Sequence, residues 1–141
     1  MENKFEQISL KPGFMKHNGG VLFKKISESE YEFKTTINKN HLNAAGITHG
    51  GFIAALVDAG AGTAAHRSSD NSPCVTISLE IKFISAVHLA QELIGITKIQ
   101  KKTKSMIFLT CELRAEKKIV ATASGVWKIL NKKLPKAGPG D

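Results

Sequence analysis

The sequence lacks the features that mark several specialised classes of protein. It has only two cysteines, Cys74 and Cys111, and their separation fits no metal-binding spacing. No uncharged apolar run is long enough to cross a membrane, and the first residues lack the apolar stretch of a secretory signal peptide. We therefore expect a cytoplasmic protein with no membrane partner, in which both cysteines act as small buried hydrophobic side chains.

Acidic residues are scarce in the last third of the chain. The formal net charge is +8, yet residues 1–95 balance nine Lys/Arg with nine Asp/Glu, whereas residues 96–141 carry eleven Lys/Arg against three Asp/Glu. A basic region can attract nucleic acid, an anionic membrane or a phosphate-bearing ligand. No helix-turn-helix, zinc-finger or RNP motif is present, so nucleic acid is not an expected partner. The alternative, that these lysines serve solubility, stays open.

The hydrophobic pattern predicts one α+β domain over residues 1–141, with residues 1–19 as an arm or short helix and residues 131–141 as a loose tail. Periodicity predicts a long helix from about residue 49 to about residue 66. Strands are expected over residues 21–27, 31–38, 75–83, 91–101, 107–115 and 121–129. Because the helix is too apolar to stand in water, an antiparallel sheet must wrap it.

Alternation in the strands predicts which side chains share a face. In the strand over residues 75–83, the expected apolar face consists of Val75, Ile77, Leu79, Ile81 and Phe83. In the last strand, the expected face consists of Ala121, Ala123, Gly125, Trp127 and Ile129. The first three members of this second face are small, which predicts a close neighbour there.

The expected helix contains one unusual residue. Asp58 is the only charged residue between Phe52 and Ala65, and an ionised side chain is costly to bury without a partner. At about 100° per residue, Asp58 shares its face with glycines and alanines only: Gly51, Ala54, Ala55, Ala61, Gly62 and Ala65. Glycine costs a helix interior roughly 1 kcal/mol relative to alanine, so packing must dictate its presence. A partner helix, a strand or a ligand could approach this face; a solvated Asp58 is the alternative.

The polar residues before and after this helix form a recognisable pattern. Asn43-x-x-Gly46-x-x-His49-Gly50-Gly51, followed by Asp58 on the helix and Thr76 on the next strand, resembles the hotdog-fold acyl-CoA thioesterases of the phenylacetic-acid-degradation (PaaI-like) type. The likeness covers roughly residues 20–130. It implies a hotdog fold, hydrolysis of a CoA thioester without a cofactor or metal, and a homodimer, often paired into a homotetramer, with active sites at the dimer interface.

The resemblance also implies residue roles. Asp58 would be the catalytic carboxylate, as nucleophile or as base for water, and Thr76 would position the water or that carboxylate. The backbone N–H of Gly50 and the side chain of Asn43 would polarise the thioester carbonyl, because unpaired N–H groups at a helix N-terminus stabilise a developing oxyanion. His49 would hold Asn43 or the substrate, and Gly51 would help to bind the substrate.

The chain departs from the family in two loops, and other readings stay open. Ala86 and Ala90 stand where the family often has Pro and Gly, and residues 101–104 replace a turn that often has Gly followed by a basic residue. A hotdog dehydratase or a non-catalytic acyl-CoA-binding protein would share the fold. The scattered histidines lack ligand spacing, and we expect surface or capping roles for His17, His41, His66 and His88. The sequence leaves the acyl group undetermined.

Overall fold

The structure, a computed structural model, describes residues 4–131 and consists of one antiparallel sheet and one long helix. The tail expected over residues 131–141 lies, apart from Asn131, outside the described residues. The order of elements along the chain is β1 (Glu6–Gln7), α1 (Phe14–His17), β2 (Leu22–Lys25), β3 (Glu30–Thr36), η1 (Lys39–His41), α2 (Gly50–Ser68), β4 (Cys74–Phe83), β5 (Glu92–Lys102), β6 (Met106–Ala115) and β7 (Lys118–Ile129).

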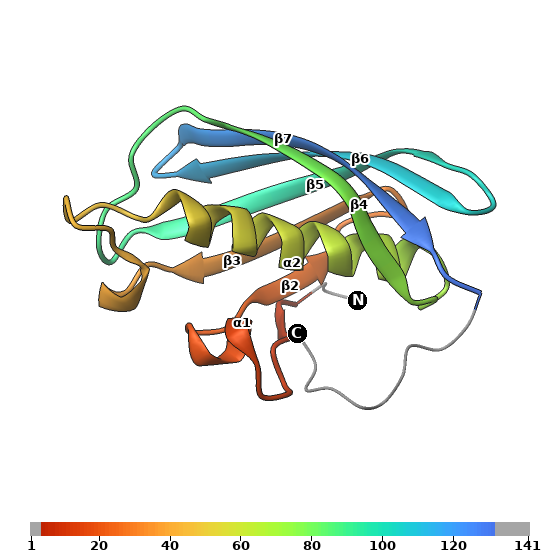
Figure 1. Cartoon of the computed structure of the whole chain (residues 1–141), viewed down its shortest axis with the longest axis horizontal. Helices are drawn as coiled ribbons and strands as arrows, with labels where there is room; N and C mark the ends of the chain where they lie inside the picture. Colours follow the sequence, from red (N-terminus) through yellow and green to blue (C-terminus); the bar gives the residue numbers. More distant parts are fainter. Residues whose placement is uncertain (1–3, 132–141) are drawn as a thin grey trace.

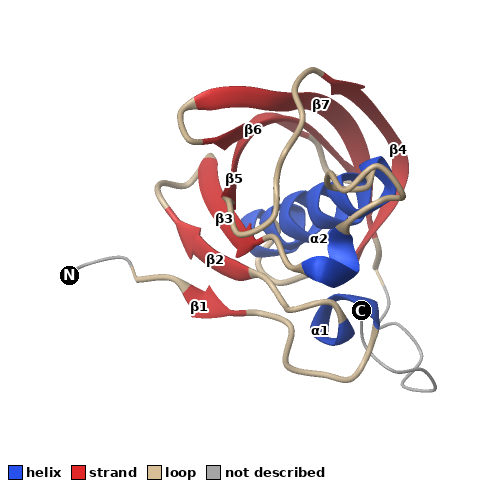
Figure 2. Ribbon diagram, turned by 90° about the vertical axis from the view of Figure 1, so that its left-hand side faces the viewer, coloured by secondary structure: helices blue, strands red, loops and turns tan. Residues whose placement is uncertain are grey.

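The sheet has the strand order β1-β2-β3-β5-β6-β7-β4, and all neighbouring strands are antiparallel. Strand β4 follows the helix in sequence but lies at the far edge, beside β7 (Figure 1). The sheet curls around α2, and α1 lies on the side that the sheet leaves open (Figure 2). The expected α+β arrangement, an antiparallel sheet wrapped around one long helix, is confirmed. No helix within residues 4–131 is long and apolar enough to cross a membrane.

A phenylalanine fixes the helix against the sheet. The Phe33 side chain is fully buried between Gly60 of α2 and Gly95 of β5. A Cβ at Gly60 would come within 2.4 Å of the ring, and one at Gly95 within 2.2 Å, so both positions require glycine for space. The expectation that packing dictates the glycines of the helix is therefore confirmed at Gly60.

The wrapped sheet also covers part of the small-residue face of α2. Ala61 and Ala65, which the sequence pattern places on the face of Asp58, are fully buried and pack with Trp127 and two β6 residues, Ile107 and Leu109. A strand is one of the neighbours expected for this face, and the sheet supplies it by curling past the apolar side of the helix to cover its flank.

The expected apolar face of β4 is wrong at Ile77 and Phe83, which are exposed, and is confirmed at Leu79 and Ile81, which pack partly buried against the core. The pairing of β4 with β7 shifts between Thr76 and Ser78, so Ile77 is an extra residue in a β-bulge. Thr76 pairs with buried Trp127, while Leu79 pairs with buried Gly125, so both lie on the side of the helix. The bulge therefore moves Thr76 onto this side and leaves Ile77 exposed. The expected face of β7 from Ala121 to Trp127 is confirmed as buried.

The N-terminal arm, residues 4–19, lies across the open side of the helix. It contains β1, which pairs with β2, and the short helix α1. The side-chain oxygen of Gln7 accepts from the backbone N–H groups of Ser9 and Val21, both at 3.0 Å. Met15 of α1 is buried, whereas Phe14 is 59% exposed. The arm thus carries apolar side chains to the one flank of α2 that the sheet does not cover.

Candidate active site

The start of helix α2 leaves a backbone donor free. His49 is the N-cap residue, and its Nδ1 accepts the N–H of Gly51 at 2.8 Å. The N–H groups of Phe52 and Ile53 donate to the His49 carbonyl oxygen. For the N–H of Gly50, no acceptor exists among the residues that the structure describes. This group lies at the positive end of the helix dipole, where it can stabilise negative charge.

Asn43 organises the loop that leads into this helix. Its Oδ1 accepts from the backbone N–H of Ala45 at 2.9 Å and of Ile47 at 3.3 Å, and its own N–H donates to the Ile47 carbonyl oxygen. With the oxygen committed to the loop, the remaining polar group of the Asn43 side chain is its NH₂, which can only donate. The side chain is therefore equipped to bind a carbonyl oxygen.

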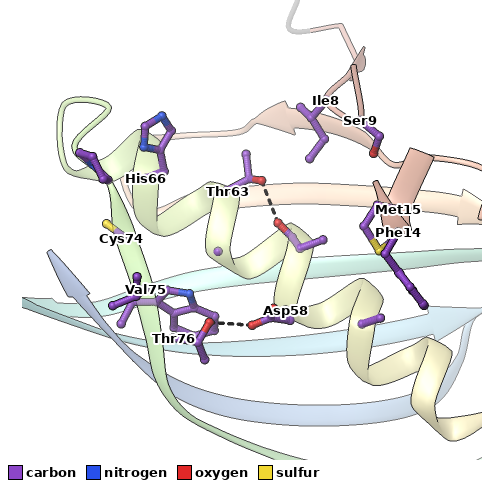
Figure 3. A pocket seen from close by; sticks show the side chains of 15 residues that line it. Ile8, Ser9, Phe14, Met15, Asp58, Thr63, His66, Cys74, Val75 and Thr76 are labelled. Carbon is purple, nitrogen blue, oxygen red and sulfur yellow. Dashed lines mark hydrogen bonds between the residues drawn. The ribbon is translucent and has the colours of Figure 1, made fainter. Parts of the chain in front are cut away.

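Asp58 lies in the middle of α2 on the open side. Its side chain is exposed, and its Oδ1 accepts the hydroxyl hydrogen of Thr76 at 2.7 Å (Figure 3). None of the ion pairs within residues 4–131 involves this carboxylate. Thr76 reaches it only because of the bulge at Ile77. One carboxylate oxygen is thus fixed by Thr76 and the other is free to accept a proton or to attack an electrophile.

A cavity of about 780 Å³ opens beside this pair. Its walls come from α2, β4, β7 and the N-terminal arm, and Figure 3 shows Phe14 and Met15 across from Asp58. Most of the lining is apolar, and its polar exceptions are Ser9, Asp58, Thr63, His66 and Thr76. The Thr63 hydroxyl already donates to the Ala59 carbonyl oxygen at 2.8 Å. An apolar cavity with a few polar groups is typical of a small-molecule site.

The residues suggested by the resemblance fall into two groups within one chain. Asp58 and Thr76 line the cavity, whereas Asn43, His49, Gly50 and Gly51 lie at the start of α2 and do not. Gly50 and Asp58 are eight residues apart on the helix, which corresponds to about 12 Å along its axis. One carbonyl carbon cannot be attacked by Asp58 while its oxygen binds Gly50 of the same chain.

Two further titratable side chains, those of His41 and Cys111, are buried and have structural roles. His41 is buried and has the expected capping role rather than the surface one, because its Nδ1 accepts the N–H of Asn38, the N-cap of η1. Its ring stacks on Phe52 and bonds the Asn18 carbonyl oxygen through Nε2. Burial raises the pKa of the Cys111 thiol to about 12, so this side chain stays protonated. Within residues 4–131, no three His, Cys, Asp or Glu side chains gather as a metal site.

Comparison with known proteins decides the family. The sequence profile of the thioesterase superfamily matches residues 45–122, which include the start of α2, Asp58 and Thr76. The chain belongs to the thioesterase superfamily. It is a thioester hydrolase, and its fold is the hotdog fold expected from the sequence.

Individual relatives agree with this assignment. A Pseudomonas aeruginosa protein that carries the name "putative esterase" is 32% identical over 94 residues, which cover 66% of this chain and 70% of that protein. Mouse acyl-coenzyme A thioesterase 13 is 24% identical over 102 residues, which cover 72% of this chain and 73% of the mouse protein. The structure of the E. coli PaaI protein from the phenylacetic acid degradation operon superposes with a TM-score of 0.69 at 18% identity, covering 79% of this chain and 80% of that one.

Sequence reasoning missed two contributors to the cavity. The N-terminal arm supplies Phe14 and Met15, and β7 supplies Trp127, the one tryptophan of the chain. A signal for Trp127 was present, because a large side chain follows three small ones on the same strand face. The curvature of the sheet decides which part of the helix lies over the Trp127 ring, and this curvature cannot be predicted from the alternation of apolar residues.

Proposed function

We propose that this thioester hydrolase is an acyl-CoA thioesterase that cleaves a CoA thioester to the free acid and CoA. The observation that carries the proposal is the Asp58 carboxylate, held by Thr76 at 2.7 Å beside an apolar cavity. The mouse relative's name, acyl-coenzyme A thioesterase, supports CoA as the thiol. The excess of lysine and arginine in residues 96–141 also suits a phosphate-bearing substrate.

The proposed reaction uses the groups described above. The thioester carbonyl oxygen binds the N–H of Gly50 and the NH₂ of Asn43, which stabilise the oxyanion as it develops. Asp58 either takes a proton from water, whose oxygen attacks the carbonyl carbon, or attacks that carbon itself to give an anhydride that water then opens. In both routes the C–S bond breaks and the CoA thiolate leaves.

The 12 Å that separate Gly50 from Asp58 within one helix lead us to propose that two chains build each site. Strand β4 is an edge strand, and Ile77, Phe83 and the adjacent Ile84 are 55–57% exposed. A symmetric dimer that pairs this edge would cover them and place the helix start of one chain near Asp58 of the other. We propose a homodimer, or a dimer of dimers, on this basis.

The direct test replaces the carboxylate. Asp58→Asn keeps the size of the side chain, and we expect thiol release from an acyl-CoA to fall on the order of 10²-fold or more, as for loss of an acid–base group. The matched control is Asp70→Asn, an exposed aspartate just beyond α2, which should retain activity. Light scattering should give the same assembly for both. Wild-type activity in Asp58→Asn would refute the role, and binding of acyl-CoA by the native protein without thiol release would favour a non-catalytic binding protein.

A mixing experiment tests the shared site. Neither Asp58→Asn nor Asn43→Ala should be active alone. In a hybrid dimer, one site regains both Asp58 and Asn43 if they come from different chains, so activity should partly return on mixing. If both residues served the same site from one chain, every site would lack one group and no activity would return.

A further inference from the structure

The indole of Trp127 presents a polar group that the proposed reaction does not use. The side chain is 1% exposed, yet it lines the cavity beside Asp58. No hydrogen bond joins its N–H to an acceptor within residues 4–131, and the N–H is not among the buried polar atoms that lack a partner. A tryptophan N–H that reaches a cavity can donate to a water molecule or to a ligand. This donor is therefore available to a molecule that binds in the cavity.

Glycine at position 62 gives the cavity access to this donor. Gly62 lines the cavity, and a Cβ there would lie 3.3 Å from Nε1 of Trp127, closer than to any other atom outside its own helix. A methyl group would thus stand where an acceptor must approach. The six-membered end of the indole packs over Gly125, where a Cβ would lie 2.5 Å from Cζ3, so the ring has little room to move away. Gly62 costs the helix stability, and an opening above the indole accounts for its presence.

We propose that the Trp127 N–H binds an oxygen atom within the acyl group of the substrate, and that the protein prefers acyl chains that carry such an acceptor over all-carbon chains. This inference rests on the proposed thioesterase function and specifies its substrate class. Gly62 follows Asp58 by one helical turn, about 6 Å along the axis. The favoured oxygen therefore lies about that far from the carboxylate, well beyond the carbonyl under attack.

The chemistry of the walls favours this occupant. Thr63, the hydroxyl residue one position further along the helix, has already donated its hydrogen to Ala59. Asp58 can only accept hydrogen bonds when ionised. His66 already bonds the Ser72 carbonyl oxygen through Nδ1. Across the cavity, the Ser9 hydroxyl of the arm accepts the N–H of Val21 and can still donate its own hydrogen. An ether or carbonyl oxygen, which can only accept, therefore has the Trp127 N–H as its matching group on the wall formed by the helix and the sheet.

The test compares paired substrates. Acyl-CoAs of equal chain length are prepared with an ether oxygen at successive positions and with CH₂ throughout. The native protein should show a kcat/KM roughly two- to tenfold higher for one ether position, the range of a single neutral hydrogen bond. Gly62→Ala, which shields the donor, and Trp127→Phe, which removes it, should abolish the preference while the all-carbon chain is still hydrolysed. Thr63→Val, which alters a neighbouring wall residue, should keep it.

A binding measurement separates this inference from the proposed function. The chain has one tryptophan, so its indole N–H gives a single resonance in a ¹⁵N–¹H spectrum. A non-hydrolysable CoA thioether that bears the favoured ether chain should shift the indole proton downfield, and the all-carbon thioether should not. Equal shifts, or an ether preference that survives in Gly62→Ala, would overturn the inference. Loss of thiol release from every substrate would instead refute the thioesterase proposal and leave the indole measurement interpretable.

Discussion

Substitution by alanine at two glycines of helix α2 should affect different properties, the stability at Gly60 and the activity at Gly50. Gly60 lies over the Phe33 ring, and Gly50 lies at the helix start beside Phe83. Alanine is favoured over glycine in helices by up to about 1 kcal/mol, so any difference between the two variants reports their surroundings.

Gly60→Ala should destabilise the protein. The new Cβ would lie 2.4 Å from the Phe33 ring, far inside the contact distance of about 3.5 Å. The ring has little room to retreat, because its far end packs against Gly95, where a Cβ would lie 2.2 Å from Cζ. Overpacking of this kind costs about 1–3 kcal/mol, of which the helix propensity of alanine offsets about 1 kcal/mol. A net loss of up to about 2 kcal/mol corresponds to a fall in Tm of roughly 5–10 °C at this chain length.

Gly50→Ala should leave stability intact and remove activity. Its Cβ would lie 3.4 Å from the Phe83 ring, and Phe83 is 57% exposed, so the ring can move. The methyl group would instead stand beside the free N–H, where the substrate oxygen is proposed to bind. We expect thiol release to fall on the order of 10²-fold, as for loss of one oxyanion donor.

The assay is a thermal melt and a thiol-release measurement on both variants at one protein concentration. A Gly60→Ala protein that melts with the wild type would refute the assignment of Phe33 as a fixed packing element. A Gly50→Ala protein with wild-type turnover would refute the role of the helix N-terminus while leaving the packing argument in place.

Three further outcomes are expected. Thr76→Val should lower kcat about tenfold, because the hydrogen bond to the Asp58 carboxylate is lost, whereas Thr76→Ser should retain most activity in steady-state kinetics. Ala90→Gly should raise the free energy of unfolding by about 1 kcal/mol in a denaturant titration, because Ala90 has φ 71°, a conformation that glycine adopts without strain. Ala86→Gly is the control and should not raise the free energy of unfolding. Raising salt should increase KM for an acyl-CoA and leave kcat nearly unchanged, since charge attraction is screened within about 10 Å at 0.1 M salt. A thioester that lacks the nucleotide should show little salt effect on KM. Replacing Lys101 and Lys104 by Gln should have the same effect as salt; Lys102 is kept because its Nζ donates to the Ser68 carbonyl oxygen at the end of α2.

The periodic parts of the fold could be predicted from the sequence. The alternation of apolar residues from Tyr31 to Ile37 predicted a face that is buried, and the predicted helix ends two residues before the observed one at Ser68. Such patterns are visible because one side of each element meets water. The same reasoning failed at β4, where one inserted residue, Ile77, reverses the alternation without any change in composition.

The candidate site was predictable in its residue types and less so in its surroundings. Asp58 was predicted because it is the only charged residue of an apolar helix segment, and Thr76 was predicted from the family resemblance. In the structure a hydrogen bond joins the two side chains. The cavity beside them could not be predicted, because its walls come from four elements whose distances apart in space depend on the curl of the sheet. Trp127 lies there for the same reason.

The arm that forms one wall of the cavity differs from the other walls in how it is attached. Helix α2 and the sheet pack against each other through the buried ring of Phe33, which fixes the walls that they provide. The arm is held by a two-residue strand, hydrogen bonds around Gln7, the Glu6–Arg67 ion pair and the buried side chain of Met15. Local opening takes the path that breaks the fewest contacts. We therefore expect residues 4–19 to open more readily than the packed helix and sheet, and the exchange rates of their amide protons would measure how readily this wall of the cavity moves.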